Sequence, residues 1–227
     1  MRALGPSLGA RGVALPLLNP SLQLFNGAGQ LMASNDDWMS NANEQEIVDS
    51  TLAPSDPRES AILISLAPGN YTAVVTGVDG AENNIALVEA YDLDSNNPPN
   101  LANISTRASV DTGDGQMIAG LIVGGMTEKS IALRGLGPSL ASASITNPLP
   151  NPTLTVVNSS GVAVAQNDDW QTDPSAGAIQ AVGLAPSNPL ESALVIAVVP
   201  GAYTAILSDA SGSSGVGLVE VYNVTGQ

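Results

Sequence analysis

The chain has 227 residues, of which 12% are charged and 44% are hydrophobic, and its formal net charge is −15. With six basic residues it lacks the cationic surface that nucleic acids and anionic lipids require, and its longest apolar runs fall short of the roughly 20 residues that span a bilayer. The absence of histidine and cysteine removes the commonest general base, thiolate chemistry, disulfides and zinc sites. We therefore expect a protein that is not an enzyme, binds no nucleic acid and inserts into no membrane.

The chain begins in a segment that recurs in its second half. Residues 2–8, Arg-Ala-Leu-Gly-Pro-Ser-Leu, are almost identical to residues 134–140. The same offset of 132 positions continues without a gap as far as the Pro-Gly-x-Tyr-Thr turns that begin at Pro68 and Pro200. Such self-similarity indicates two copies of one structural module.

One residue is lost after these turns, because the Leu-Val-Glu of residues 87–89 matches residues 218–220 at an offset of 131. The repeat of about 132 residues predicts one domain at residues 1–97 and a second at residues 98–227.

The tetrapeptide Asn-Asp-Asp-Trp occurs once in each copy. Clustered carboxylate and amide oxygens in a loop suit calcium, a hard cation that takes about six to eight oxygen ligands. The candidates for calcium ligands are Asn35, Asp36, Asp37, Asn167, Asp168 and Asp169, with further oxygens at Asp92, Asp94, Asn96, Asn97, Asp111 and Asp114. Alternatively, the Asn and Asp side chains cap the turn and the following helix, and the tryptophan fills the end of a sandwich.

Short runs of Val, Ile, Leu and Thr, interrupted about every ten residues by Gly, Pro, Asn and Ser, predict an all-β fold. One helix per copy is expected, at residues 44–50 and 174–182, and Asp173-Pro174 resembles a cap followed by a first-turn proline. The clearest strands of the second copy are predicted at residues 153–157, 193–199, 203–207 and 217–222. About eight strands per repeat are typical of a sandwich or jelly roll, so we expect two tandem, jelly-roll-like β-sandwich domains.

The second copy begins with leading strands, at residues 101–133, that the first copy lacks. This segment predicts strands at residues 104–110 and 116–124 and the start of a third at 129–136. The first copy has no counterpart of the first two strands, and its third strand begins abruptly at Met1. The first domain is therefore expected to be a sandwich with strands missing.

A sandwich without two of its strands exposes unpaired backbone groups and apolar inner faces. With a single lysine, Lys129, the sheet edges are poorly protected against strand addition. We therefore expect the chain to take strands from copies of itself and, because donor and acceptor surfaces differ, to assemble head-to-tail. The expected interface comprises Met1, Arg2, Ala3, Leu4, Ile104, Val110, Ile118, Leu121 and Val123. Alternatively, the first copy is a smaller sandwich, or the chain is a piece of a longer array of repeats.

Two further patterns invite a chemical interpretation. Asp111-Thr112-Gly113 resembles the triplet of aspartic proteases, but its continuation into Asp114-Gly115 is typical of a hairpin turn, which we prefer. The charged residues that recur are an arginine and two glutamates, and an arginine and a glutamate on opposing strands most simply form a half-buried ion pair. These recurring residues are Arg2 with Arg134, Glu59 with Glu191, and Glu89 with Glu220.

The series Pro-Thr-Leu-Thr-Val-Val-Asn-Ser-Ser-Gly at residues 152–161, the Asn-Asp-Asp at 167–169 and the Pro-Gly-Ala-Tyr-Thr at 200–204 resemble bacterial pre-peptidase C-terminal-type β-sandwich modules. Residues 2–8 and 103–107 are similar to the tandem modules of large secreted bacterial proteins. The resemblance covers most of both copies and implies a secreted, non-catalytic module. We therefore expect a structural subunit of an extracellular filament or surface fibre that assembles by strand sharing and needs no cofactor. The alternative is a calcium-dependent adhesive or carbohydrate-binding module of a larger secreted protein.

Overall fold

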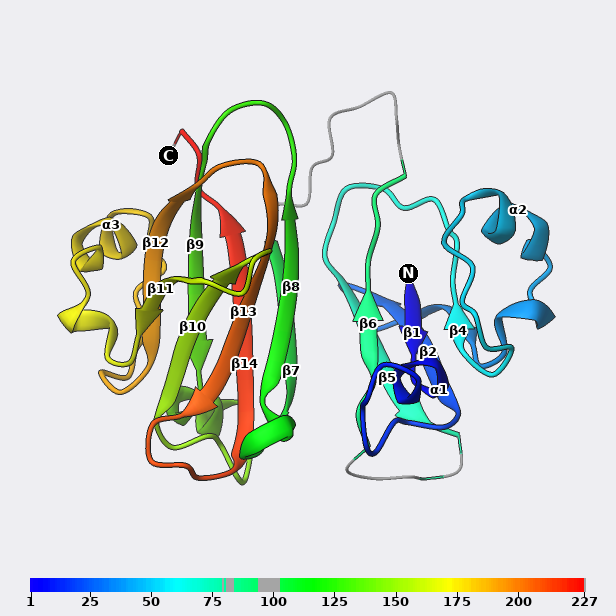
Figure 1. The fold of residues 1–227 in the computed structure, drawn as a ribbon, viewed down its shortest axis with the longest axis horizontal. Helices are drawn as coiled ribbons and strands as arrows, with labels where there is room; N and C mark the ends of the chain where they lie inside the picture. The colour runs from blue at the N-terminus through cyan, green and yellow to red at the C-terminus, as the bar shows by residue number, and fades with distance from the viewer. Residues whose placement is uncertain (79, 81–83, 94–102, 227) are drawn as a thin grey trace. The chain divides into compact units, whose positions relative to one another are not determined.

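The computed structural model describes residues 1–78, 80, 84–93 and 103–226. The chain forms two compact units, Met1–Asn100 and Leu101–Gln227, so the division falls three residues beyond the expected boundary. Each unit consists of two β-sheets, as Figure 1 shows. The prediction of an all-β fold with two tandem sandwiches is confirmed. Among the helices within the described ranges, none has the length and hydropathy of a membrane span.

Unit 2 is a full sandwich of two four-stranded antiparallel sheets, with strand orders β11-β10-β13-β8 and β12-β9-β14-β7. Its strands are β7 (Asn103–Val110), β8 (Met117–Val123), β9 (Lys129–Leu136), β10 (Pro152–Asn158), β11 (Ala163–Asn167), β12 (Ser192–Val198), β13 (Gly201–Asp209) and β14 (Gly215–Asn223). The predicted strands of the leading segment and of the second copy are all present, within two residues at either end.

The core of unit 2 follows from the alternation along its strands. In β13 the inward-facing Tyr203, Ala205 and Leu207 are buried, while the intervening Thr204 and Ile206 face outward. A period of two places one apolar row against the opposite sheet, which supplies residues such as Leu133, Leu194 and Val219.

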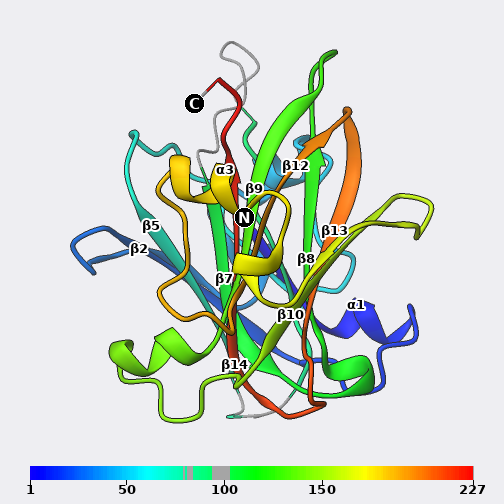
Figure 2. The same cartoon turned by 90° about the vertical axis from the view of Figure 1, so that its left-hand side faces the viewer.

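A short helix covers the outer face of one sheet of unit 2. Helix α3 (Ala176–Ala181) packs on β12 and, with the turn η4 (Trp170–Thr172), buries Trp170 and Ile179 against Ala132 and Ala193. Figure 2, viewed from the side of α3, shows this helix in front of β9 and β12.

The expectation that Asp173 caps this helix is wrong. The N-cap position is Ser175, which makes no side-chain capping bond, and Asp173 instead ends η4. The Asp173 carboxylate accepts hydrogen bonds from the N–H and hydroxyl of Ser175, so it fixes the residue before the helix.

Unit 1 repeats this plan with fewer strands, in two three-stranded sheets of order β4-β1-β6 and β3-β2-β5. Its strands are β1 (Arg2–Leu4), β2 (Pro20–Asn26), β3 (Leu31–Asn35), β4 (Ser60–Ala61), β5 (Tyr71–Gly77) and β6 (Leu87–Glu89). Its helical elements are α1 (Pro6–Gly9), the turn η1 (Trp38–Ser40) and α2 (Glu44–Asp49), and those of unit 2 not yet named are the turns η2 (Gly113–Gly115) and η3 (Pro138–Ala143). The described part of unit 1 has no counterpart of β7 or β8.

The Asp111-Thr112-Gly113 segment is a turn, but it does not close a hairpin. Its N–H at Asp111 donates to the carbonyl of Gly115, 2.8 Å away, around η2. The flanking strands β7 and β8 belong to different sheets, so the segment carries the chain from one layer of the sandwich to the other.

A buried glutamate explains why Gly-Pro-Ser-Leu recurs. The Glu59 carboxylate is fully buried and accepts hydrogen bonds from the N–H of Gly5 (3.0 Å), the N–H of Ser7 (2.9 Å) and the hydroxyl of Ser7. A side chain at Gly5 would place Cβ 1.8 Å from the carbonyl oxygen of Leu17, so glycine is required there. Glu191 makes the same three bonds in unit 2.

Candidate functional site

The most unusual feature of the chain is the open side of unit 1. In unit 2, β8 pairs with β13 and β7 pairs with β14, so these two strands close the same side of both sheets. The unit 1 counterparts of β13 and β14, which are β5 and β6, each lie at the end of a sheet. Among the described residues no strand pairs with their outer edges. An edge strand of this kind presents backbone N–H and C=O groups that another strand can bind.

We define the open side of unit 1 as these two edges together with Leu66, Tyr71, Ala73, Val75 and Val88. These residues correspond by the repeat to Val198, Tyr203, Ala205, Leu207 and Val219, all of which are buried in the core of unit 2. In unit 1 the counterparts of the β13 residues are only partly buried.

Two positions show how much apolar surface is left uncovered. Val88 is 42% exposed, whereas Val219 is 1% exposed. Leu66 is 39% exposed, whereas Val198 is 3% exposed. The difference follows from the missing strands, because Val110 and Met117 on β7 and β8 are buried in the same core cluster as Val198 and Val219. The open side is therefore an apolar surface. The equivalent surface of unit 2 is covered by that unit's own leading strands, β7 and β8.

The structure divides the predicted interface residues of the leading segment into two groups. Val110 is fully buried, and Leu121 and Val123 pack partly buried against the core of unit 2, so all three serve their own sandwich. Ile104 and Ile118 are exposed, and Ile118 lies on the outer face of β8 beside Ile206 of β13.

The expected interface residues Met1, Arg2, Ala3 and Leu4 lie on or beside a strand that has no free edge. Strand β1 lies in the middle of its sheet, where Arg2 pairs with Ala61 on β4 and with Glu89 on β6. Ala3 is fully buried in the core of unit 1. Because β1 is paired on both sides, it has no free edge to offer a partner strand, and the accessible edges are those of β5 and β6.

The Asn-Asp-Asp-Trp motif of unit 1 ties a turn to a strand. The Asn35 side chain donates to the carbonyl of Asp37 (2.9 Å) and accepts from the N–H of Ala61 (2.9 Å). Asp36 and Asp37 are exposed, while Trp38 is buried against α2 and donates its indole N–H to the carbonyl of Asp56. The amide oxygen that could have bound a cation is thus already used by the backbone.

The second motif repeats the bonds of its asparagine, but the Trp170 indole N–H and one oxygen of the half-buried Asp169 have no hydrogen-bond partner among the described residues. Asn167 donates to the carbonyl of Asp169 and accepts from the N–H of Ala193. Asp168 is exposed and accepts a hydrogen bond from Thr153. Within the residues that the structure describes, no group of three or more acidic side chains is placed to hold a metal ion. Of the additional oxygens considered, Asp94, Asn96, Asn97 and the side chain of Asp114 lie outside the described residues.

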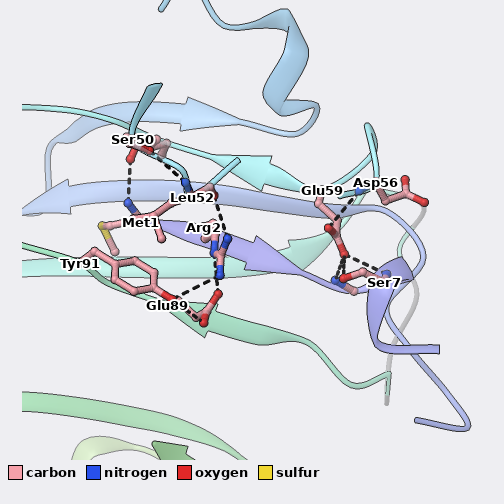
Figure 3. A network of polar contacts seen from close by, with 11 residues as sticks. Met1, Arg2, Ser7, Ser50, Leu52, Asp56, Glu59, Glu89 and Tyr91 are labelled. Carbon is pink, nitrogen blue, oxygen red and sulfur yellow. Dashed lines mark hydrogen bonds and ion pairs between the residues drawn. The ribbon is translucent and has the colours of Figure 1, made fainter. Parts of the chain in front are cut away.

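A cluster of arginine, glutamate and tyrosine joins β1 to β6 in unit 1, as Figure 3 shows, and it recurs in unit 2. In unit 1 the Nε of Arg2 donates to Glu89 (2.6 Å), and a second guanidinium nitrogen donates to the carbonyl of Leu52 (2.8 Å). The hydroxyl of Tyr91 donates to the other oxygen of Glu89 (2.8 Å), and the Arg2 guanidinium lies 5.4 Å from the centre of the Tyr91 ring. The expected ion pair is therefore formed with Glu89, and not with Glu59.

Arg134, Glu220 and Tyr222 form the same cluster in unit 2. Burial acts against the charged form of Arg2, but the hydrogen bond and the charge of Glu89 raise the pKa of Arg2 above its usual value. Burial and the charge of Glu220 raise the pKa of Tyr222. The polar atoms of both clusters bond to one another and to the backbone, an arrangement typical of a structural clamp.

The residues that define the open side were not singled out by the sequence patterns. Leu66 and Val88 look like ordinary core residues of a strand, because the same positions are buried in the second copy. The signal that identifies them is indirect: they align with Val198 and Val219, whose neighbours in the fold come from the segment that the first copy lacks.

Comparison with known proteins gives only distant structural likeness. No family model and no curated protein matches the chain. A pre-peptidase C-terminal domain of collagenase from Bacillus anthracis is 16% identical and covers 56% of this chain and 99% of that domain, with a TM-score of 0.34. The VP2 subviral particle of infectious bursal disease virus is 9% identical over 92% of this chain and 57% of that one, with a TM-score of 0.22. Neither comparison indicates a function.

Proposed function

We propose that the protein is a non-enzymatic structural subunit of an extracellular filament or surface fibre. Copies of this chain join head-to-tail by adding strands to the open side of unit 1. The observation that carries the proposal is the difference between Val88 and Val219, which places an apolar core position of unit 1 in contact with solvent. Soluble domains rarely leave such inner faces uncovered unless a partner binds there.

The composition of the edges supports strand addition. Strand β5 contains no charged residue, and β6 contains only Glu89, which Arg2 already neutralises. Natural sheet edges are usually protected by lysine, proline or inward-pointing charge, and β5 and β6 have none of these. Unit 1 therefore presents two unprotected edges and the apolar surface between them on one side.

The direction of assembly follows from the difference between the units. In the described residues, unit 2 has two strands that unit 1 lacks, so an interface that uses the open side is not self-complementary. A contact between unlike surfaces need not close into a ring, and repeated contacts give a filament. The extracellular location and membership among large secreted bacterial proteins rest on the sequence resemblance alone.

The experiment that tests this function measures association of the purified chain over a wide range of concentration, by light scattering coupled to gel filtration and by electron microscopy. We expect oligomers or fibres that grow with concentration. Since each copy carries a net charge of −15, association should strengthen as salt screens the repulsion between copies. A monomer at every concentration and ionic strength would overturn the proposal.

A matched pair of variants identifies the surface. Val88 and Leu87 are neighbours on β6, are 42% and 40% exposed, and face opposite sides of the strand. Val88→Asp places a charge on the open side and should abolish association, whereas Leu87→Asp should leave it nearly unchanged. Equal effects of the two variants would mean that association uses a different surface.

A further inference from the structure

We propose that the open side of unit 1 is a binding site for a free leading-strand segment of a second molecule. By this we mean a polypeptide with the sequence pattern of residues 103–132 that is not already paired within a sandwich. The inference rests on the strand addition proposed above and specifies which strands bind, in which register, and in what state they must be supplied.

Unit 2 provides the template for the first contact. There, β8 pairs with β13 in a register that places Leu121 opposite Tyr203, Ala119 opposite Ala205 and Met117 opposite Leu207. In the repeat, these three positions of β13 correspond to Tyr71, Ala73 and Val75 on β5. A β8-like strand of the partner would therefore lie along β5 with its inward-facing side chains over the exposed core of unit 1.

The second contact is on β6. In unit 2, β7 places Thr106 opposite Val219 and Ser105 opposite Glu220, and the Ser105 hydroxyl donates to the Glu220 carboxylate. The equivalent positions on β6 are Val88 and Glu89. The Glu89 side chain is about twice as exposed as that of Glu220, 22% against 10%, so a β7-like strand would cover both the apolar position and the ion pair.

The third contact is the first half of β9. In unit 2, Lys129 and Ile131 pair with Val198 and Ile196 on β12. The corresponding residues of unit 1, Leu66 and Ile64, lie beyond the end of the two-residue strand β4 and are exposed. The unpaired stretch after β4 can therefore pair with the residues of the segment that follow its β8-like strand. All three contacts are made by one continuous piece of sequence.

The segment must be free because residues 103–132 are already used in unit 2. Strands β7 and β8 complete unit 2 of their own chain, where they bury Val110 and Met117. Moving them to unit 1 of another copy would close one sandwich and open another, so the number of open sides would stay the same. The assembly of copies proposed above must therefore use the edges of strands that remain in their own sandwich. Only a segment that is not committed to a sandwich gains the full free energy of closure, and the partner is therefore a chain that presents one.

The binding test uses the full chain and a labelled fusion of residues 101–132 to a soluble carrier protein. We expect saturable one-to-one binding by fluorescence anisotropy. Hydrogen exchange should slow in β5 and β6 and stay unchanged in β13 and β14. Val88→Asp should weaken binding at least about tenfold, because it buries a charge without a partner, and Leu87→Asp should change it by less than about twofold. A fusion carrying Leu121→Asp should also fail to bind.

The outcomes separate this inference from the proposed function. The inference is overturned if the fusion does not bind, if Val88→Asp and Leu87→Asp act alike, or if protection appears only in β13 and β14, which would indicate exchange into unit 2. If the chain alone forms no filament but the fusion binds to β5 and β6, assembly by copies of this chain fails and the binding site stands. If filaments form and the fusion does not bind, the reverse holds.

Discussion

Replacing the equivalent valines Val88 and Val219 with alanine measures how much of the core of unit 1 is exposed to solvent. Val219 is 1% exposed, and Val219→Ala removes two carbons from a closed core. At about 0.8 kcal/mol for each buried CH2 group, plus the penalty for a small cavity, unit 2 should lose about 2 kcal/mol of unfolding free energy. Val88 is 42% exposed, so about three fifths of the transfer term remains and no closed cavity forms. Unit 1 should lose about 1 kcal/mol or less.

The two tryptophans make the assay specific for each unit, because Trp38 lies in unit 1 and Trp170 lies in unit 2. Trp170→Phe leaves a fluorescence signal that reports unfolding of unit 1, and Trp38→Phe leaves one that reports unit 2. Urea unfolding at micromolar protein concentration then gives the free energy of each unit with and without its valine.

Equal losses for Val88→Ala and Val219→Ala at low concentration would refute the reasoning, since they would mean that Val88 is already covered in the isolated chain. If the loss caused by Val88→Ala rises toward that of Val219→Ala only as protein concentration increases, a second molecule covers the open side. The concentration series therefore separates a closed unit from an assembled one.

Three further outcomes are expected. Glu191→Ala leaves the buried N–H of Gly137 and the half-buried N–H of Ser139 without their acceptor, at about 1–3 kcal/mol for the buried group. Glu191→Gln keeps one carbonyl oxygen as an acceptor and should cost less in urea unfolding. Burial acts to raise the pKa of Asp209, but hydrogen bonds from Ser211, Asn151 and Ser213 outweigh it and hold the pKa below its usual value. Its stabilising effect on unit 2 is therefore complete above the unfolded-state value and is lost as pH falls through the folded-state value. Asp209→Asn should lessen the loss of stability measured by acid titration, and an equally steep loss would count against this role. A chelator should leave the melting temperature of the chain unchanged, and a fall would support calcium at the Asn-Asp-Asp-Trp loops.

The sequence predicted the strands and their order of repetition because both depend on local patterns. Tyr203, Ala205 and Leu207 alternate with outward-facing residues, and such a period of two predicts a strand wherever the chain lies in the fold. The repeat then predicted that the first copy lacks two strands, and in the described residues β5 and β6 do lie at sheet ends.

The errors arose where pairing between distant segments decides the structure. Met1, Arg2, Ala3 and Leu4 were expected to contribute to an interface, but β4 and β6, 57 and more positions away in the sequence, pair with both sides of β1 and leave it no free edge. Asp111-Thr112-Gly113 has the composition of a hairpin turn, but its flanking strands lie in different sheets, because β7 pairs with β14 and β8 pairs with β13. Neither of these long-range pairings can be predicted from local composition.

The antiparallel pairing of β7 with β14 also determines how unit 2 responds to force. Asn103, at the start of β7, lies opposite Tyr222, near the end of β14, so the chain enters and leaves this unit at the same end. A pulling force along the chain therefore loads the hydrogen bonds between these strands one pair after another, as a zipper opens, instead of loading all of them at once. A fibre built from such units would lengthen at low tension by peeling its terminal strands, and it would behave as an extensible tether rather than a stiff rod.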